Sequence, residues 1–356
     1  QAVDARGNTA VDRAVVSGDI RAITALKPIL DIVDASGRTP LMLAIAQRRS
    51  AVVQAMINAG ASLDVRDNDG NTALSLVAQS GDVHYVKMLV TAKATLDAAN
   101  DDQTPLMIAV RKGHTATAQY FVEAGVRLHA RDNGGNAVLA HATLDGDISL
   151  MKAIISARAG LDVTNNDGLT PLMLAVHNGD AAAVAALVDA GALLNVRDPA
   201  GHTALTLAAR NGDLDVLATL IAAKASLTTK NNDAQTPLML AETRGHAAVV
   251  QALIDAVDKD GNTALSLAAL ASDAETARAL LATKASLDAK NKNGETPLMV
   301  AINAGNLAVA QILIDAGADY DSRRDDELTT VMVASSADHV DVLKLLLKVN
   351  ASIDTA

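Results

Sequence analysis

The sequence predicts an all-α fold, a solenoid of about eleven helix–turn–helix repeats with projecting hairpin-like loops. The chain has 356 residues, more than one compact core usually supports, which favours several domains or a repeat array. Half of the residues are hydrophobic, yet only three Tyr, one Phe and no Trp occur. The apolar residues are therefore mainly Ala, Leu, Val and Ile, which suit closely packed helices. The third observation is a periodic column of threonines.

This threonine column recurs about every 33 residues and defines the repeat. An apolar residue follows two positions after every member, and Ala follows five positions after ten of the eleven. The column consists of Thr9, Thr39, Thr72, Thr104, Thr170, Thr203, Thr236, Thr263, Thr296 and Thr329, with Ala137 in the one gap. Eleven similar units therefore follow one another along the chain.

Each unit contains the signals of two short helices and a loop. The Thr side chain can cap the first helix by accepting a backbone N–H, and a Pro after it suits the first helical position. Nine residues after the Thr column, Gly occurs in eight repeats and can end this helix in a left-handed conformation. A second apolar segment follows, such as residues 51–57, and then a turn rich in Asp, Asn and Gly. The recurring Asp or Asn, as at Asp67, predicts an Asx turn, because the rest of a calcium loop is absent.

Five repeats begin with Thr-Pro-Leu, at Thr39, Thr104, Thr170, Thr236 and Thr296. In this frame the motif resembles the ankyrin repeat family, and the resemblance covers the chain from about Asp4 to Ile353. It implies a single ankyrin-repeat domain over residues 1–356, with an N-terminal cap at about 1–33 and a C-terminal cap at about 323–356. The family usually has His after Thr-Pro-Leu, where this chain has Met, as at Met42. We therefore expect Met packing to replace the usual inter-repeat hydrogen bond of that His.

A longer period of about 66 residues is also present, because Thr-Pro-Leu-Met repeats alternate with Thr-Ala-Leu-Ser or similar ones. One loop breaks the frame: six residues are missing between Ala256 and Val257, relative to Gly60–Val65 of the second repeat. Either this loop is truly shorter, or six of its residues are missing from this sequence. The presence of the loop in all other interior repeats favours the second interpretation.

Charge and motifs exclude several classes of function. The net charge of −11 argues against general nucleic-acid binding and against adhesion to anionic lipid, and no apolar run approaches the ~18 residues of a membrane span. No Cys occurs, and neither a His-Glu-x-x-His helix nor a phosphate-binding Gly loop is found. His114 and His246 stand where the family often has a structural His. His177 and His202, in adjacent repeats, could approach each other but lack a third ligand. We therefore predict no enzyme, no catalytic residues, no metal and no cofactor.

The first helices and loop tips of a solenoid leave a long surface, and the resemblance implies that this surface binds proteins. Six residues before the Thr column, six of eleven positions are basic. Candidate partner-binding residues in the loops are Arg66, Asp67, Arg131, Asp132, Arg197, Asp198 and Lys230. Candidates near the ends of the first helices are Arg48, Gln79, Arg111, Lys112, His177, Asn178, Arg210, Asn211 and Arg244. One hypothesis is a basic, amide-lined groove for an acidic or polar partner. The other is ordinary solvated cations, neutralised by the neighbouring Asp residues.

We expect a protein-binding scaffold or inhibitor, monomeric on its own, that binds neither nucleic acid nor membrane. The chain also resembles bacterial periplasmic ankyrin proteins, some of which protect their makers by occluding self-made cell-wall peptidases. It opens with Gln1-Ala2 rather than Met, which favours a periplasmic or secreted protein over a cytoplasmic one. The alternative function is a structural module of a larger assembly, without an inhibitory role.

Overall fold

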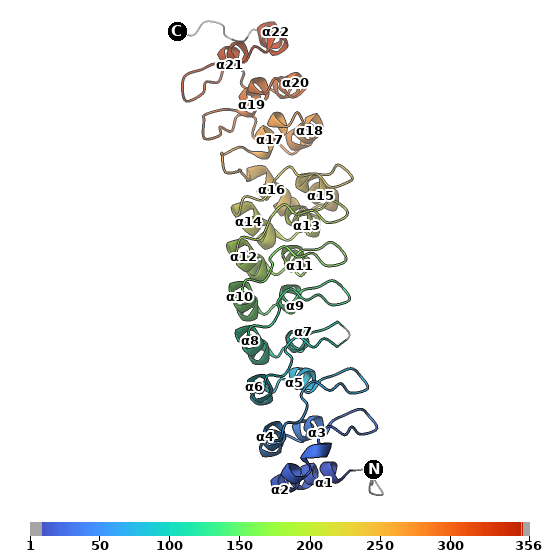
Figure 1. The fold of residues 1–356 in the computed structure, drawn as a ribbon. Coiled ribbons are helices and arrows are strands. Elements are labelled where there is room, and N and C mark those ends of the chain that lie inside the picture. The colour runs from blue at the N-terminus through green and yellow to red at the C-terminus, as the bar shows by residue number, and fades with distance from the viewer. Residues whose placement is uncertain (1–8, 101, 350, 352–356) are drawn as a thin grey trace. The chain divides into compact units, whose positions relative to one another are not determined.

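The computed structural model describes residues 9–100, 102–349 and 351. Within these residues, 22 α-helices follow one another as eleven pairs and no β-strand occurs, only three isolated bridges (Figure 1). This confirms the predicted all-α architecture of helix–turn–helix repeats with loops between them. The expected terminal caps, at about 1–33 and 323–356, extend into residues 1–8, 350 and 352–356, which lie outside the described residues.

Each repeat contributes one first helix and one second helix. The first helices are α1 (Ala10–Ser17), α3 (Pro40–Ala46), α5 (Ala73–Ser80), α7 (Pro105–Arg111), α9 (Val138–Asp145), α11 (Pro171–His177), α13 (Ala204–Asn211), α15 (Pro237–Arg244), α17 (Ala264–Leu270), α19 (Pro297–Asn303) and α21 (Thr330–Ser336). The second helices are α2 (Ile20–Ala25), α4 (Ser50–Ala59), α6 (Val83–Thr91), α8 (Thr115–Glu123), α10 (Ile148–Ser156), α12 (Ala181–Asp189), α14 (Leu214–Ala222), α16 (Ala247–Asp255), α18 (Ala274–Ala282), α20 (Leu307–Asp315) and α22 (Val340–Lys348). A short 3₁₀ helix, η1 (Lys27–Ile29), follows α2.

The chain divides into two units, residues 1–171 and 172–356. In the first unit, α1, α3, α5, α7 and α9 pack in succession, each against the next. In the second unit, α13 packs on α15, α17 on α19 and α19 on α21, and second helices pack likewise on second helices. The Ala column lies between them: Ala44, Ala109, Ala208 and Ala301 are all fully buried. Small side chains at this position let neighbouring helices approach closely, as the sequence predicts.

The Thr column caps the first helices. Nine of its threonines accept a hydrogen bond from the backbone N–H three residues later, at 3.2–3.3 Å. Each such cap contributes roughly 1 kcal/mol to stability. Ala137, in the gap of the column, provides no side-chain cap to α9.

The glycines nine residues after the Thr column are all left-handed, with φ between 65° and 78°, which confirms the predicted helix ends. At Gly81 a side chain is also excluded sterically, because a Cβ at this position would lie 2.5 Å from the ring of His114 in the next repeat. Three repeats place other residues in the same conformation: Arg48 (φ 57°), Ser272 (φ 58°) and Asp338 (φ 57°). The expected Met packing is confirmed as well, since Met42 and Met299 are at most 2% exposed.

The loop after α16 is short, and the structure joins Ala256 directly to Val257. Ala256, which corresponds to Ala59 of the second repeat, is extended (φ −70°, ψ 144°), and the short loop has no counterpart of the left-handed Gly60 (φ 88°) that ends α4. Val257 pairs with Thr263 in an isolated bridge. In the second repeat, buried Ala61 follows the helix. The short loop has no residue that corresponds to Ala61. A cavity of about 240 Å³ lies beside Val257 and Leu280.

Candidate protein-binding surface

The basic residues six positions before the Thr column tie successive loops together. Arg66 Nη1 donates to the carbonyl oxygen of Gly70 in its own loop, at 2.8 Å, and to that of Ala99 in the next loop, at 2.7 Å. Arg131 Nη1 donates in the same way to Thr164 O, at 2.9 Å. Because Ala99 O and Thr164 O are main-chain carbonyls 33 residues away, these side chains stabilise the stacking of the loops.

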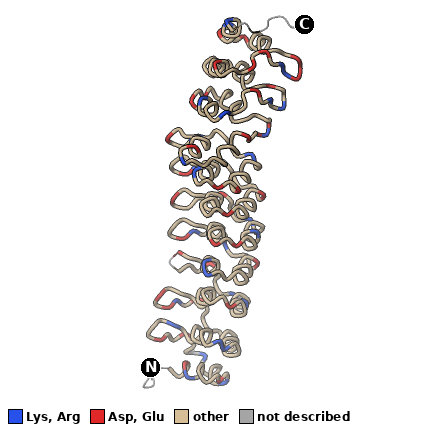
Figure 2. The backbone as a smooth tube through the Cα atoms, turned by 180° about the vertical axis from the view of Figure 1, so that it is seen from behind, with Lys and Arg blue, Asp and Glu red and all other residues tan. Residues whose placement is uncertain are grey.

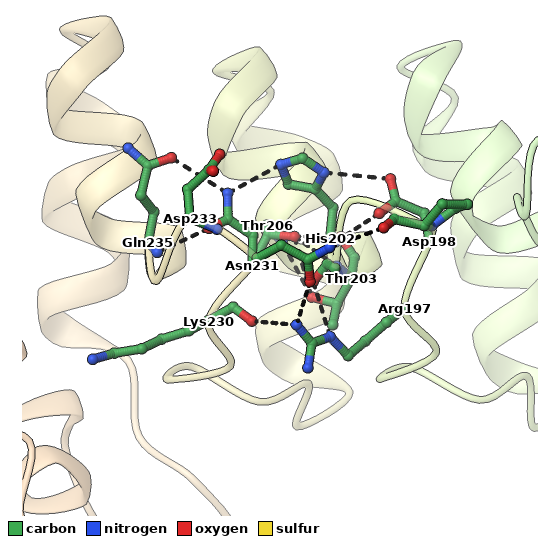
Figure 3. A network of polar contacts seen from close by, with 12 residues as sticks. Arg197, Asp198, His202, Thr203, Thr206, Lys230, Asn231, Asp233 and Gln235 are labelled. Carbon is green, nitrogen blue, oxygen red and sulfur yellow. Dashed lines mark hydrogen bonds and ion pairs between the residues drawn. The ribbon is translucent and has the colours of Figure 1, made fainter.

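Arg197 makes the fullest version of this contact (Figure 3). Its Nε donates to Gly201 O at 3.2 Å, and its Nη2 donates to Lys230 O at 3.0 Å and to Asn232 Oδ1 at 3.2 Å. The ammonium group of Lys230 forms an ion pair with Asp273, with Nζ 2.8 Å from Oδ2. Burial of Asp273 would raise its pKa, but the hydrogen bonds from Lys230 and Thr276 outweigh this and lower the pKa. All four loop cations proposed for partner binding therefore have partners within the chain.

The three acidic loop candidates shape turns. Asp67 Oδ1 accepts the backbone N–H of Asn71 at 2.8 Å, and Asp132 and Asp198 accept the N–H four residues later at 2.8 and 2.7 Å. These are the predicted Asx turns. Each Asp thus serves its own loop, while the neighbouring Arg donates to carbonyl oxygens.

Two histidines lie buried against these turns. His202 Nδ1 lies 3.3 Å from Asp198 Oδ2, and the side-chain amide of Asn231 donates to Nε2 at 3.3 Å (Figure 3). His141 Nε2 lies 2.9 Å from Asp132 Oδ2. Burial lowers the pKa of His141, Asp132 opposes this, and the positive charge of Arg111 lowers the pKa further. His141 had no role in the sequence-based prediction.

His114 and His246 contact the preceding repeat. His114 Nε2 lies 3.0 Å from Gln79 O, and His246 Nε2 lies 3.1 Å from Arg210 O. These contacts with the preceding repeat confirm the structural role expected for both residues. His177 is exposed whereas His202 is buried, and the described part of the chain holds no group of three or more potential metal ligands.

The cations near the ends of the first helices differ from those in the loops. We call Arg48, Arg111, Lys112, Arg210 and Arg244 the helix-end cations. Within the described residues, none of their side chains takes part in a hydrogen bond or an ion pair, and all are exposed except Arg210, which is half-buried. They lie seven to nine residues after the Thr column, at or just beyond the C-terminal ends of the first helices. Figure 2 shows how basic and acidic positions are distributed along the backbone; the chain has 30 Lys and Arg against 41 Asp and Glu.

Amide and imidazole groups accompany these cations. Gln79 lies beside them in the first unit, where its Nε2 donates to Asn71 Oδ1 at 2.9 Å. In the second unit, His177, Asn178 and Asn211 are exposed at the same helix ends as Arg210 and Arg244. The structure thus places all nine helix-end candidates near the C-terminal ends of first helices, seven to nine residues after the Thr column, and separates them from the loop candidates.

A groove between α3 and α5 was missed in the sequence. Its volume is about 320 Å³, its floor includes Met42, Ile45, Leu76 and Tyr85, and Arg38 and Arg48 also line it. The available signal was Ala46 at the seventh position after the Thr column, where the fourth repeat has Arg111. A small side chain there leaves the space between the helices open.

Stacked helix pairs that display one variable face define a class of protein, the repeat scaffolds that bind other proteins. A family model described as ankyrin repeats (three copies) matches residues 49–132, 139–231, 224–291 and 273–356. The chain therefore belongs to the ankyrin repeat family, whose repeats generally mediate protein–protein interaction.

A crystal structure of an ankyrin repeat domain from Acinetobacter baumannii is similar, with 29% sequence identity and a TM-score of 0.49 over 50% of this chain and 94% of that chain. No curated protein matches the sequence. None of the described helices has the length and apolarity needed to cross a membrane.

Proposed function

We propose that this chain binds an acidic partner protein through the helix-end cations. The observation that supports this most is the contrast between two sets of basic residues. The loop cations donate hydrogen bonds to carbonyl oxygens or form an ion pair with Asp273. Within the described residues, the side chains of the helix-end cations take part in no hydrogen bond and no ion pair. A protein with net charge −11 thus keeps unpaired positive charge, within the described residues, at the C-terminal ends of several first helices.

Physical chemistry favours carboxylates as the groups that these cations recognise. Arg can form two parallel hydrogen bonds to one carboxylate, which gives geometric specificity as well as energy. Charge complementarity also accelerates association and rejects partners of the wrong sign. Large aromatic anchors, which often dominate interfaces, are scarce in this chain. The binding energy is therefore expected to come from several Arg-centred contacts spread over neighbouring repeats.

The test begins with capture of the partner from the native source. The variant Arg210→Glu/Arg244→Glu changes two helix-end cations on α13 and α15, which pack against each other. The matched control, Lys152→Glu/Arg278→Glu, makes the same charge change at exposed positions on second helices. We expect the first variant to bind at least about tenfold more weakly, a loss of about 1.4 kcal/mol, and the control to bind normally. Equal binding by both variants would contradict the proposal.

The loop cations are less suitable for this test. Replacing Arg66, Arg131 and Arg197 by Glu also removes the hydrogen bonds that join adjacent loops. Weaker binding by such a variant could then reflect a changed loop structure rather than a lost contact with the partner.

The narrower form of the proposal is an inhibitor that covers a bacterial cell-wall peptidase in the periplasm. Membership of the ankyrin family and the resemblance to bacterial periplasmic ankyrin proteins support it. In that case the captured partner is a peptidase that loses activity as the chain is added up to an equimolar amount, and the chain is recovered from the periplasmic fraction. A partner whose activity does not change would instead favour a structural module. Either result leaves the test of the helix-end cations unaffected.

A further inference from the structure

The residues that line the groove between α3 and α5 do not recur together at the equivalent positions of the other repeats. Ala46 leaves its mouth open, where the corresponding residues of the fourth and sixth repeats are Arg111 and His177. Tyr85 closes its far end, where the equivalent residue of the fifth repeat is Leu150. Its phenol oxygen accepts a hydrogen bond from Ser50 at 3.1 Å, which joins the second and third repeats behind the groove.

The groove combines an apolar floor with two unpaired guanidinium groups. Met42, Ile45 and Tyr85 are at most 7% exposed. Arg38 and Arg48 are exposed and, within the described residues, neither side chain takes part in a hydrogen bond or an ion pair. One acid also lines the groove, but Asp82 Oδ1 caps α6 by accepting the backbone N–H of His84 at 3.1 Å. Fixed positive charge therefore exceeds negative charge around an apolar slot.

Arg48 occupies a backbone position that favours glycine. Its φ is 57°, and eight of the eleven repeats have Gly at this place. A left-handed conformation is unfavourable for a residue with a Cβ, so Gly would suit the fold better. Residues in such sparsely populated conformations cluster at binding sites, and here the strained residue is one of the two cations of the groove.

We propose that this groove binds an extended segment of the partner in which an apolar side chain lies between two acidic residues. This inference rests on the proposed protein-binding function and names the chemistry of a separate anchor point. The apolar side chain enters between Ala46 and Tyr85. One carboxylate pairs with Arg38 and the other with Arg48.

The dimensions suit such a segment. Arg38 and Arg48 lie two residues beyond the two ends of the seven-residue helix α3, which is roughly 10 Å long at 1.5 Å per helical residue. An extended chain covers that distance in about three residues at roughly 3.3 Å each. A pattern of acid, two apolar residues and acid therefore spans the length of α3, and the Arg38 and Arg48 side chains lie beyond its two ends. The volume of about 320 Å³ limits the buried part of the bound segment to about one large side chain.

The experiment uses the full chain and a synthetic tetrapeptide, acetyl-Asp-Leu-Leu-Asp-amide. The methyl group of Met42, labelled with carbon-13, reports on the floor of the groove by NMR, and its signal is assigned with the variant Met42→Leu. The key variant is Arg48→Gly, which removes one cation and relieves the backbone at the same time. Lys93→Gly is the matched control. It removes an exposed positive charge at a left-handed position (φ 67°) in the same unit, away from the groove.

We expect a saturable shift of the Met42 signal with the acidic peptide. Binding should weaken at least about tenfold with acetyl-Asn-Leu-Leu-Asn-amide or in Arg48→Gly, and it should be unchanged in Lys93→Gly. The denaturation midpoint of Arg48→Gly should equal or exceed that of the parent, which rules out unfolding as the cause. No saturable shift, or equal binding by Arg48→Gly or of the amide peptide, overturns the inference. Because the natural partner is not needed, these outcomes are independent of the test on Arg210 and Arg244.

Discussion

Arg197→Ala tests whether the loop cations serve the fold. The substitution removes three hydrogen bonds, to Gly201 O, Lys230 O and Asn232 Oδ1, with lengths of 3.0–3.2 Å. Each hydrogen bond contributes about 0.5–1.5 kcal/mol net, and the lower half of this range applies because Arg197 is exposed. The three together give an expected loss of about 2 kcal/mol.

Hydrogen exchange at a single amide suits this prediction best, because repeat arrays can unfold in parts. The backbone N–H of Asn232 donates to Ala200 O at 3.0 Å and thus reports the contact between the two loops that Arg197 joins. A loss of about 2 kcal/mol corresponds to roughly 30-fold faster exchange, since 1.4 kcal/mol is a factor of ten. The comparison variant is Arg210→Ala in the same unit, whose side chain has no hydrogen-bond or ion-pair partner within the described residues. It should change exchange little. Unchanged exchange in Arg197→Ala, or equal acceleration in both variants, would refute the division into two sets of cations.

Three further predictions concern stability. Ala137→Thr should supply the missing cap of α9 and raise the free energy of unfolding by about 1 kcal/mol, measured by urea denaturation; a decrease would show that the site cannot accept the hydroxyl. Burial raises the pKa of Glu242, so Glu242→Val should stabilise the protein at neutral pH. This gain in stability should shrink as the pH falls, because the carboxylate of the parent becomes protonated. A gain independent of pH would exclude burial of the charge as the cause. Burial lowers the pKa of His141 in the folded state. The contribution of His141 to stability is therefore complete above about pH 6.5, its pKa in the unfolded chain. This contribution is lost as the pH falls towards the folded pKa. His141→Leu should remove this loss, whose slope cannot exceed about 1.4 kcal/mol per pH unit; an unchanged pH profile would place the titration elsewhere.

The fold could be predicted from the sequence because its signals are local. A threonine such as Thr39 caps the helix that follows it, and Gly81 ends its helix in the left-handed conformation. Both effects depend on residues within one repeat. Repetition of the same signals at a fixed spacing then implies that the units stack. The division into domains depends on contacts between distant repeats, which local signals do not determine. The single domain over residues 1–356 therefore stays a prediction.

The surface was only partly predictable, since side-chain partners lie in other repeats. Arg66 and Arg111 are both basic residues at recurring positions, yet one donates to a carbonyl 33 residues away and the other has no such partner within the described residues. The sequence does not show this difference, because it depends on the reach of a side chain to the next loop. The groove beside Arg48 was missed for a related reason. It arises from a small residue, Ala46, whose effect appears only when two helices are placed side by side.

The absence of catalysis, metal and cofactor also stays a prediction. So do the periplasmic location and the monomeric state. The family supports protein binding, and the unpaired helix-end cations supply the chemistry through which that binding is proposed to occur.

The structure of the complex with the captured partner is the most direct measurement. We expect carboxylate oxygens of the partner within hydrogen-bonding distance of the guanidinium groups of Arg210 and Arg244, at the C-terminal ends of α13 and α15. A partner that contacts only the second helices, with both guanidinium groups left in solvent, would contradict the proposed role of the helix-end cations.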